Sequence, residues 1–291
     1  MIIDDKKNLK LQNRNRPHLF FVGCGAMGEA VLDLLLRKGI LEKSDITIAE
    51  KNPARLTEIK EKYSVKTIQP DDIKCPKEAD KINIVFLAVK PQNAGEALKK
   101  LKNLRFELLI TILAGVKCGF FNDGIPDIPV LRVMPNLAIR VGKSVSALYA
   151  NNYFRQSPLC DIFTGFAEKI FGACGEILWA SDEDMLDKIT ALSGSGPAYV
   201  CFFLEAFAEA AKRLGFAQKD ALHIALKTFE GAIEYLNASG GITPEELRKK
   251  VTSPGGTTEK AISYFEKKDL KKIIDGGIRS AYKRAKDLGK E

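Results

Sequence analysis

The first part of the chain alternates short, mostly apolar segments with stretches of helical spacing. The apolar segments predict strands at residues 19–22, 46–49, 82–89, 108–113, 130–133 and 145–149. The clearest helical stretches between them are residues 29–38 and 53–62, and the second begins at Asn52-Pro53, a capping residue followed by an N1 proline. Strands this apolar are covered by helices on both faces, so the pattern predicts a parallel, doubly wound α/β sheet.

After Trp179 the pattern becomes helical throughout. Helices are predicted at residues 181–191, 197–214, 219–238, 244–251, 258–267 and 270–288, with no strand among them. The segment 197–214 is apolar around most of its circumference, interrupted by Glu205 and Glu209. A helix of this kind must be buried, and in so small a domain part of its surface is expected to contact a second subunit. We therefore expect a flexible arm at residues 1–16, an α/β domain at 17–180 and an all-helical, dimer-forming domain at 181–291.

Composition narrows the classes of protein that fit this sequence. The chain has 291 residues, 45% of them hydrophobic and 28% charged, which suits two folded domains and excludes a disordered or fibrous protein. Its longest apolar run, residues 108–116, has about half the length that a bilayer requires. The first residues also lack the apolar core of a signal peptide. We therefore expect a cytoplasmic protein without membrane contact.

Charge, cysteines and histidines limit the possible partners and mechanisms. The formal net charge is +8, but the basic residues are dispersed, so we expect a mild attraction for anionic ligands and no nucleic-acid partner. The six cysteines form no CxxC pair and none lies near a histidine, which predicts reduced thiols and no metal site. The two histidines, His18 and His223, are both poorly placed to act as a catalytic base.

A glycine-rich turn follows the first predicted strand. It has the sequence Gly23-Cys24-Gly25-Ala26-Met27-Gly28. This GxGxxG pattern opens a helix inside a strand–helix–strand unit, as the dinucleotide fingerprint requires. Gly23 permits the tight turn, Gly25 lets the backbone approach the pyrophosphate, and Gly28 lets the helix pack on the strand. The free N–H groups of the helix N-terminus favour a diphosphate, so residues 17–180 are predicted to be a Rossmann domain that binds NADH or NADPH.

The residues after the second strand leave the choice of cofactor open. Glu50 is placed to bind the ribose 2′-hydroxyl, which favours NADH. Its neighbours Lys51, Asn52 and Arg55 could instead hold the 2′-phosphate of NADPH.

Two further strand ends are expected to line the same crevice. They are Ala88-Val89-Lys90-Pro91 and Ala114-Gly115. The carboxyl ends of parallel strands face the ligand in sheets of this type, and small residues there permit close approach of the ribose and nicotinamide. Lys90 is a candidate for contact with the cofactor ribose or phosphate.

Two loops in the helical part are harder to explain by packing. One is Ser193-Gly194-Ser195-Gly196-Pro197-Ala198-Tyr199, and the other is Thr252-Ser253-Pro254-Gly255-Gly256-Thr257-Thr258. The second loop combines two glycines, several hydroxyls and a helix N-terminus, which together suit a carboxylate. Helix capping alone needs one hydroxyl and would not need two adjacent glycines.

With these motifs, the sequence resembles the pyrroline-5-carboxylate reductase family from about Leu19 to the C-terminus. The resemblance rests on the order and spacing of the glycine-rich turn, Ala88-Val89-Lys90-Pro91, Ala114-Gly115, Arg132-Val133-Met134-Pro135-Asn136, residues 193–199 and residues 251–258 with Ala261. It implies a Rossmann domain followed by a helical dimerisation domain. It also implies that the chain forms a homodimer, which in this family is often assembled into decamers. It also implies that the substrate is held by Ser253, Gly255, Gly256, Thr257 and Thr258, with Thr258 near its ring nitrogen.

The resemblance also implies a reaction. The family reduces the C=N bond of the cyclic imine 1-pyrroline-5-carboxylate with NADPH or NADH, giving L-proline in the last step of proline synthesis. A protonated imine is electrophilic enough to need no strong base, which fits the shortage of histidine. The sequence departs from the family pattern at Leu113, at Leu137-Ala138 with Arg140, and at Gly241, which bears on substrate fit.

Two other functions fit the sequence less well. A β-hydroxyacid dehydrogenase would need a catalytic lysine in the helix of the second domain, but residues 194–207 contain none. A non-catalytic, dinucleotide-binding regulator would be expected to lose the substrate loop, yet residues 253–258 are intact.

Overall fold

The computed structural model describes residues 16–74 and 81–289. It divides into two compact units, of which the first runs to Gly194 and takes in the chain from Tyr282 onward, and the second runs from Ser195 to Ala281. The units thus separate at Gly194, whereas the sequence placed the boundary at residue 180. The physical reason is that Leu186, in the helix after residue 180, is buried with Ala147 of the sheet. Of the predicted arm, residues 1–15 lie outside the described range and Arg16 already belongs to a strand.

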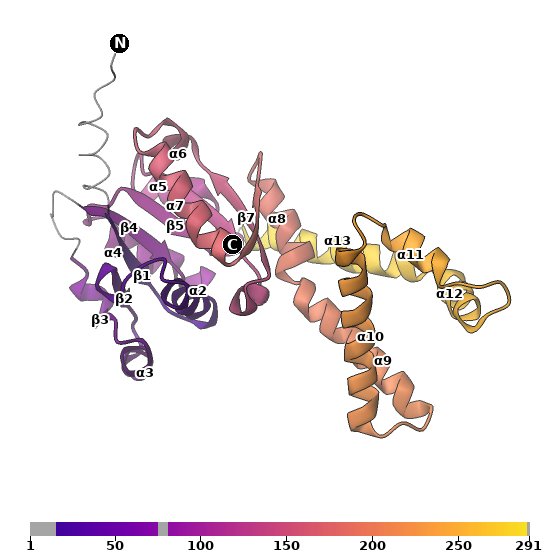
Figure 1. Ribbon diagram of the computed structural model, residues 1–291. Coiled ribbons are helices and arrows are strands. Elements are labelled where there is room, and N and C mark those ends of the chain that lie inside the picture. The colour runs from indigo at the N-terminus through magenta and orange to yellow at the C-terminus, as the bar shows by residue number, and fades with distance from the viewer. Residues whose placement is uncertain (1–15, 75–80, 290–291) are drawn as a thin grey trace, which may run out of the picture. The chain divides into compact units, whose positions relative to one another are not determined.

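The described residues of the first unit form an eight-stranded sheet (Figure 1). Its strands are β1 (Arg16–Val22), β2 (Ile46–Ala49), β3 (Lys66–Ile68), β4 (Lys81–Leu87), β5 (Leu108–Thr111), β6 (Val130–Met134), β7 (Ser144–Ala150) and β8 (Gly175–Trp179). In space they follow the order β3-β2-β1-β4-β5-β6-β7-β8. Strands β1 to β6 are parallel, whereas β7 is antiparallel to β6 and parallel to β8. The first six strands have the Rossmann order, in which ligands bind where the order reverses, between β1 and β4.

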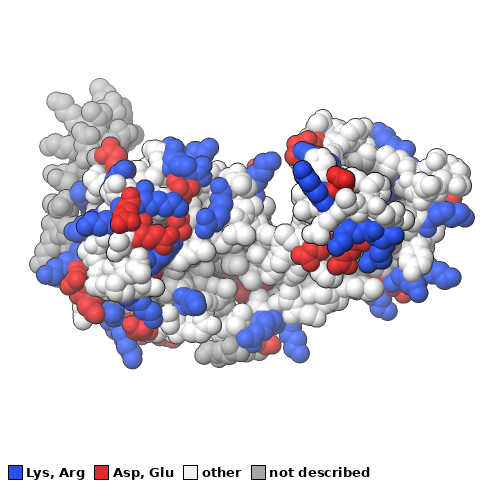
Figure 2. Space-filling view, turned by 90° about the horizontal axis from the view of Figure 1, so that it is seen from below, with Lys and Arg blue, Asp and Glu red and all other residues white. Residues whose placement is uncertain are grey.

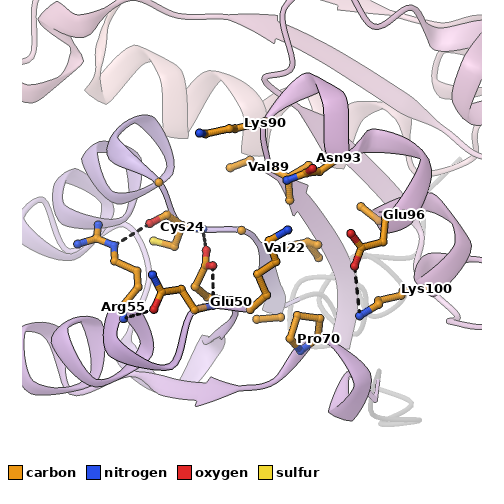
Figure 3. Close-up of a pocket in the computed structure, with 17 residues that line it drawn as sticks. Val22, Cys24, Glu50, Arg55, Pro70, Val89, Lys90, Asn93, Glu96 and Lys100 are labelled. Atoms are coloured by element: carbon orange, nitrogen blue, oxygen red, sulfur yellow. Dashed lines mark hydrogen bonds and ion pairs between the residues drawn. The ribbon is translucent and has the colours of Figure 1, made fainter.

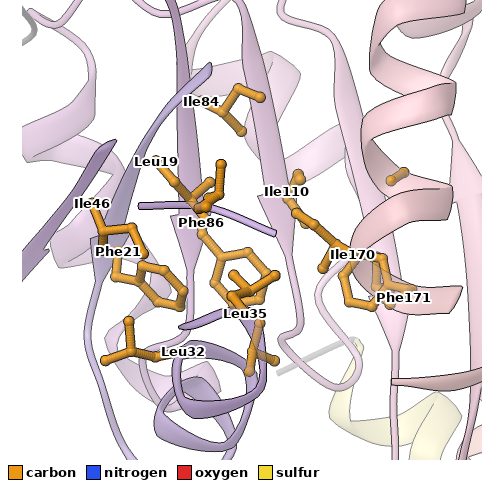
Figure 4. Packing of buried hydrophobic residues seen from close by; sticks show 14 of the residues in the cluster. Leu19, Phe21, Leu32, Leu35, Ile46, Ile84, Phe86, Ile110, Ile170 and Phe171 are labelled. Carbon is orange, nitrogen blue, oxygen red and sulfur yellow. The ribbon is translucent and has the colours of Figure 1, made fainter. Parts of the chain in front are cut away.

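Helices cover both faces of this sheet, as predicted. They are α2 (Ala26–Arg37), α3 (Pro53–Tyr63), α4 (Ala94–Leu101), α5 (Cys118–Gly124), α6 (Asn152–Gln156), α7 (Cys160–Ala173) and α8 (Asp184–Ile189). Successive residues of β1 alternate between two cores: Leu19 and Phe21 pack with α2 and α7 (Figure 4), whereas Phe20 packs with α4 and α5. This period of two on a doubly covered sheet confirms the predicted doubly wound architecture.

Two strands at the edges of the sheet were not predicted. β3 has three residues, the first of them exposed, and the residues of β8 are exposed or half-buried. Edge strands bury little surface, so neither shows the apolar run that marks the central strands.

The second unit is entirely helical in its described residues. It contains α9 (Gly196–Arg213), α10 (Gln218–Ala238), α11 (Pro244–Lys250), α12 (Thr257–Lys267) and the first part of α13 (Leu270–Leu288), which ends in the first unit. α9 and α10 pack together, with the rings of Phe207 and Phe229 edge to face at 5.1 Å. The expected burial of α9 does not occur within one chain, because Phe202 is 68% exposed and Phe207 is 48% exposed. None of the described helices is long and apolar enough to cross a membrane.

The described cysteines are all free, but they differ widely in exposure. Cys24, Cys118 and Cys174 are buried, Cys160 is half-buried, and Cys201 on α9 is exposed. Burial raises the pKa of the Cys24 thiol to about 12. The buried thiols therefore remain protonated and unreactive near neutral pH.

Candidate active site

A cavity of about 520 Å³ opens at the carboxyl ends of β1, β2 and β4 (Figure 3). This position is the switch point of the sheet, where the strand order reverses between β1 and β4. The volume lies within the range of cofactor and small-molecule sites. The fold therefore places a dinucleotide-sized cavity where the sequence predicted one.

Most of the predicted cofactor residues line this cavity. Those that do are Gly23, Cys24, Gly25, Glu50, Lys51, Ala88, Val89 and Lys90. Those outside its lining are Ala26, Met27 and Gly28 in the first turn of α2, Pro91 at the start of η3 (Pro91–Asn93), and Ala114 and Gly115 after β5.

Sequence reasoning missed one wall of the cavity. Its residues are Pro70, Asn93, Glu96, Ala97 and Lys100. Most of them come from α4, whose apolar residues recur at helical spacing and would have revealed the helix. Lys100 is already paired there, 2.8 Å from Asp71.

The glycine-rich turn has the geometry of a diphosphate cradle. Gly23 has φ +81°, and a Cβ there would lie 2.7 Å from Val89 Cγ1, so the turn requires glycine. A Cβ on Gly28 would lie 3.0 Å from Ala88 Cβ, which explains how α2 packs closely on the sheet. Nothing lies within 4 Å of a Cβ placed on Gly25. No side chain caps α2 at Gly25, so its first N–H groups remain available to an anion.

Glu50 is fixed at the end of β2 by two backbone donors. Its Oε2 accepts a hydrogen bond from Cys24 N, and its Oε1 accepts one from Asn52 N, both at 3.0 Å. The Asn52 side chain in turn accepts hydrogen bonds from Ala54 N and Arg55 N, which confirms Asn52 as the cap of α3. The carboxylate of Glu50 is thus held against the glycine-rich turn.

Arg55 is bound by three acceptors within the chain. Its Nε donates to the carbonyl oxygen of Cys24 at 3.1 Å. Its Nη2 pairs with Glu29 and its Nη1 with Glu58, each at 2.6 Å. The guanidinium therefore links α3 to the glycine-rich turn and to the first turn of α2.

Glu29 is a buried carboxylate that sequence reasoning did not single out. It accepts hydrogen bonds from Arg55, from Lys62 Nζ at 2.8 Å and from the Tyr63 hydroxyl at 2.9 Å. Burial favours the neutral acid, but the hydrogen bonds from these three residues outweigh it and lower the pKa of Glu29 to about 2. The ionised side chain ties α2 to α3 beside the cavity.

The loop after β6 is joined to the turn that precedes α9. Asn136 Nδ2 donates to Ser193 Oγ at 2.8 Å. A Cβ on Gly194, the last residue of the π-helical turn η5 (Thr190–Gly194), would lie 2.7 Å from Met134 Cε. Arg140 Nη2 donates to the carbonyl oxygen of Ala26 at 3.0 Å, so this departure from the family pattern contacts the first turn of α2.

The end of α13 rests on the loop that contains Gly115. Within the first unit, the Tyr282 hydroxyl donates to the carboxylate of Asp184 at 2.7 Å, and Lys286 Nζ lies 3.4 Å from it. A Cβ on Gly115 would lie 3.0 Å from the Leu288 side chain. The loop after β5, predicted to face the cofactor, is therefore held by the last turn of the helix.

The predicted substrate loop lies in the second unit, at the N-terminus of α12. Gly255 has φ +74°, a backbone conformation that favours glycine, and its N–H donates to Glu259 Oε2 at 2.7 Å. Gly256 caps the helix and donates to the Ser253 carbonyl oxygen at 3.0 Å. Within the described part of the chain, the Thr258 hydroxyl makes no hydrogen bond. The five predicted substrate residues thus lie together, in a different unit from the cofactor cavity.

The described ranges contain no group of three or more His, Cys, Asp or Glu side chains that could hold a metal ion. Two of the charged residues that line the cavity, Arg55 and Lys100, are in the ion pairs described above.

Two family models match separate parts of the chain. Residues 183–288 match the family described as pyrroline-5-carboxylate reductase dimerisation. Residues 18–115 match the family described as NADP oxidoreductase, coenzyme F420-dependent.

Relatives and solved structures cover nearly the whole chain. It is 33% identical to the pyrroline-5-carboxylate reductase of Synechocystis sp., over 94% of this chain and 98% of that protein. It is 34% identical to the one from Aquifex aeolicus, over 92% and 96%. The structure of a pyrroline-5-carboxylate reductase from Coxiella burnetii superposes with a TM-score of 0.81 at 32% identity, covering 94% of this chain and 99% of the other.

A second solved structure comes with a bound dinucleotide. The Plasmodium falciparum pyrroline carboxylate reductase, crystallised with NADP bound, has a TM-score of 0.78 at 26% identity and covers 93% of this chain and 97% of its own. Fold, motifs and near-complete coverage agree. The chain belongs to the pyrroline-5-carboxylate reductase family.

Proposed function

We propose that this protein reduces 1-pyrroline-5-carboxylate to L-proline with a reduced nicotinamide dinucleotide. The C=N carbon of the ring gains a hydride and the ring nitrogen gains a proton, while the dihydronicotinamide is oxidised. The observation that carries the proposal is the presence of a dinucleotide cavity and an intact Ser253–Thr258 loop in one chain of this family.

The cavity fits the proposed cofactor. The open space at Gly25 and the uncapped N-terminus of α2 suit the diphosphate, and Glu50 at the end of β2 suits a ribose. Val89 and Lys90 would lie along the same ligand, because they follow β4 at the switch point. When bound, the nicotinamide supplies the hydride.

The loop before α12 would bind and orient the substrate. Its backbone N–H groups and the helix N-terminus attract the carboxylate, and the Thr258 hydroxyl hydrogen-bonds the ring nitrogen. Because a protonated imine is electrophilic, the protein's main task is to position the two reactants rather than to supply a base. The N–H of Gly255 is bound to Glu259 in the free chain, so this carboxylate would have to yield to the substrate.

The reaction is tested by following the oxidation of NADH and NADPH with 1-pyrroline-5-carboxylate and detecting proline by chromatography. Consumption of both substrates with a matching yield of proline is the expected result. Dinucleotide binding without turnover would instead identify a non-catalytic regulator.

We also propose a homodimer formed through the second unit, with further assembly into a decamer as the resemblance implies. The exposed aromatic residues of α9 support the dimer, as does the match to a dimerisation family. The free cysteines of the described chain suit a reducing, cytoplasmic compartment.

A further inference from the structure

We infer that the cofactor cavity selects NADH over NADPH, with Glu50 as the residue that determines this specificity. Glu50 lines the cavity at the end of β2, and each of its carboxylate oxygens accepts one backbone N–H, from Cys24 and from Asn52 (Figure 3). These bonds hold the carboxylate in place and leave lone pairs on both oxygens. A fixed acceptor of this kind matches the hydroxyl donors of an unmodified ribose.

Arg55 and Asn52, which line the cavity, already have hydrogen-bond partners within the chain. All three nitrogens of Arg55 have acceptors, and two of those acceptors are the carboxylates of Glu29 and Glu58. The side-chain oxygen of Asn52 accepts the N–H groups at the start of α3, so this residue can offer a phosphate only its uncharged amide NH2 group. To turn toward a phosphate, Arg55 would have to give up its ion pair with the buried carboxylate of Glu29, which would keep only Lys62 and Tyr63 as partners.

Lys51 is the remaining cation in the segment between β2 and α3. It lines the cavity and is exposed, and it makes no ion pair with any residue that the structure describes. A phosphate monoester carries a charge of roughly −1.5 to −2 at neutral pH. One exposed ammonium beside the fixed carboxylate of Glu50 cannot balance that charge. The adenosine ribose of NADH carries an uncharged diol in place of the phosphate. Glu50 does not repel this diol, and no second cation is needed to bind it.

This inference takes from the proposed function only that the ligand is a nicotinamide dinucleotide. Binding is therefore measured in the absence of the imine substrate. Titration calorimetry of the full chain with NADH and NADPH is expected to give a Kd at least tenfold lower for NADH. A parallel pair, 5′-AMP and 2′,5′-ADP, isolates the effect of the 2′-phosphate and should favour 5′-AMP. Equal or tighter binding of NADPH would overturn the proposal, whether or not the protein reduces the imine.

Variants then assign the preference to one side chain. Glu50→Gln keeps the shape and one acceptor oxygen but removes the charge, and Glu50→Ser removes the carboxylate. Each should narrow the ratio of the two Kd values at least tenfold. Glu61→Gln removes one negative charge from an exposed position on α3 and is expected to leave the ratio unchanged. If the ratio of the two Kd values is unchanged in both Glu50 variants, or changes equally in Glu61→Gln, Glu50 does not determine the cofactor preference.

Discussion

Thr258 is the side chain on which the proposed chemistry depends most directly. Its hydroxyl makes no hydrogen bond within the described chain and is therefore free to bind a substrate atom. We expect Thr258→Ala to lower kcat roughly 10²-fold, the loss typical of one positioned hydrogen-bonding group, with a smaller effect on dinucleotide affinity. Steady-state kinetics with Thr258→Ser as the conservative control, which should retain most activity, test this. Unchanged kinetics in Thr258→Ala would exclude the residue from the mechanism.

Gly255 controls the shape of the substrate loop through its backbone. At φ +74°, an alanine is strained, and we expect Gly255→Ala to destabilise the protein by about 1–2 kcal/mol. Gly231 lies inside α10 with open space around it, so Gly231→Ala should be neutral or stabilising by up to about 1 kcal/mol. Urea unfolding of both variants measures the difference. Equal stability of the two would show that the loop relaxes without cost.

Glu29 makes stability depend on acidity. Its pKa is lowered from 4.5 to about 2 in the folded chain, so its contribution is fully present above pH 4.5 and is lost as the pH falls toward 2. The shift corresponds to about 3 kcal/mol. We expect Glu29→Gln to lower stability at neutral pH by about this amount and to flatten the acid limb of the stability profile. Urea unfolding between pH 2 and pH 7 checks this, with Glu61→Gln expected to follow the parent protein.

The sequence predicts which residue types line the cavity, but it does not predict their hydrogen-bond and ion-pair partners. The GxGxxG pattern and the position of Glu50 identify a dinucleotide site from sequence alone. Arg55 looked equally available for a phosphate, because only the fold reveals that Glu29 lies beside it. Ion pairs between residues far apart in sequence depend on how the helices pack, and no spacing rule reports them.

At the scale of elements, the end of α13 contacts both α8 and the loop after β5. We expect Tyr282→Phe to remove a hydrogen bond to Asp184 worth about 1 kcal/mol, because the carboxylate is partly exposed. The last turn of α13 should then open more often, while the central strands stay protected. Hydrogen exchange resolved by peptide would show faster exchange at residues 283–289. Exchange that rose uniformly across the sheet would instead indicate global destabilisation.

Whether a strand could be located from the sequence depends on how much of its surface is buried. Central strands such as β2 and β5 are buried at every position, and their apolar runs located them correctly. The edge strands β3 and β8 carry no such run and were missed. The helix 184–189 resembles the later helices in pattern, yet it packs on β7, so periodicity alone could not assign it to a unit.

At the scale of the molecule, the exposed aromatic side chains of α9 imply a partner. We expect light scattering to give twice the chain mass of 32.1 kDa, or a multiple of that dimer. Phe202 is 68% exposed, and Phe202→Glu should shift the mass toward that of the monomer. Phe120, 39% exposed on α5 of the first unit, supplies the control Phe120→Glu, which should leave the assembly intact. A monomeric parent protein would contradict the proposed dimer.

The chain carries a formal net charge of +8. On the face drawn in Figure 2, basic and acidic side chains are interspersed over both parts of the chain. The described residues also form exposed ion pairs four positions apart, such as Lys249 with Glu245 and Arg279 with Asp275. Surface pairs of this kind add little stability.

The unequal exposure of the cysteines gives the chain a natural set of labelling sites. Cys201 lies exposed on α9, so its alkylation rate would fall when a second subunit covers that helix. Cys24 is buried in the glycine-rich turn, so it should react only when the turn opens, and a bound dinucleotide should slow that reaction. One alkylation time course, analysed by peptide mass, would thus report subunit association and cofactor occupancy separately, without an engineered probe.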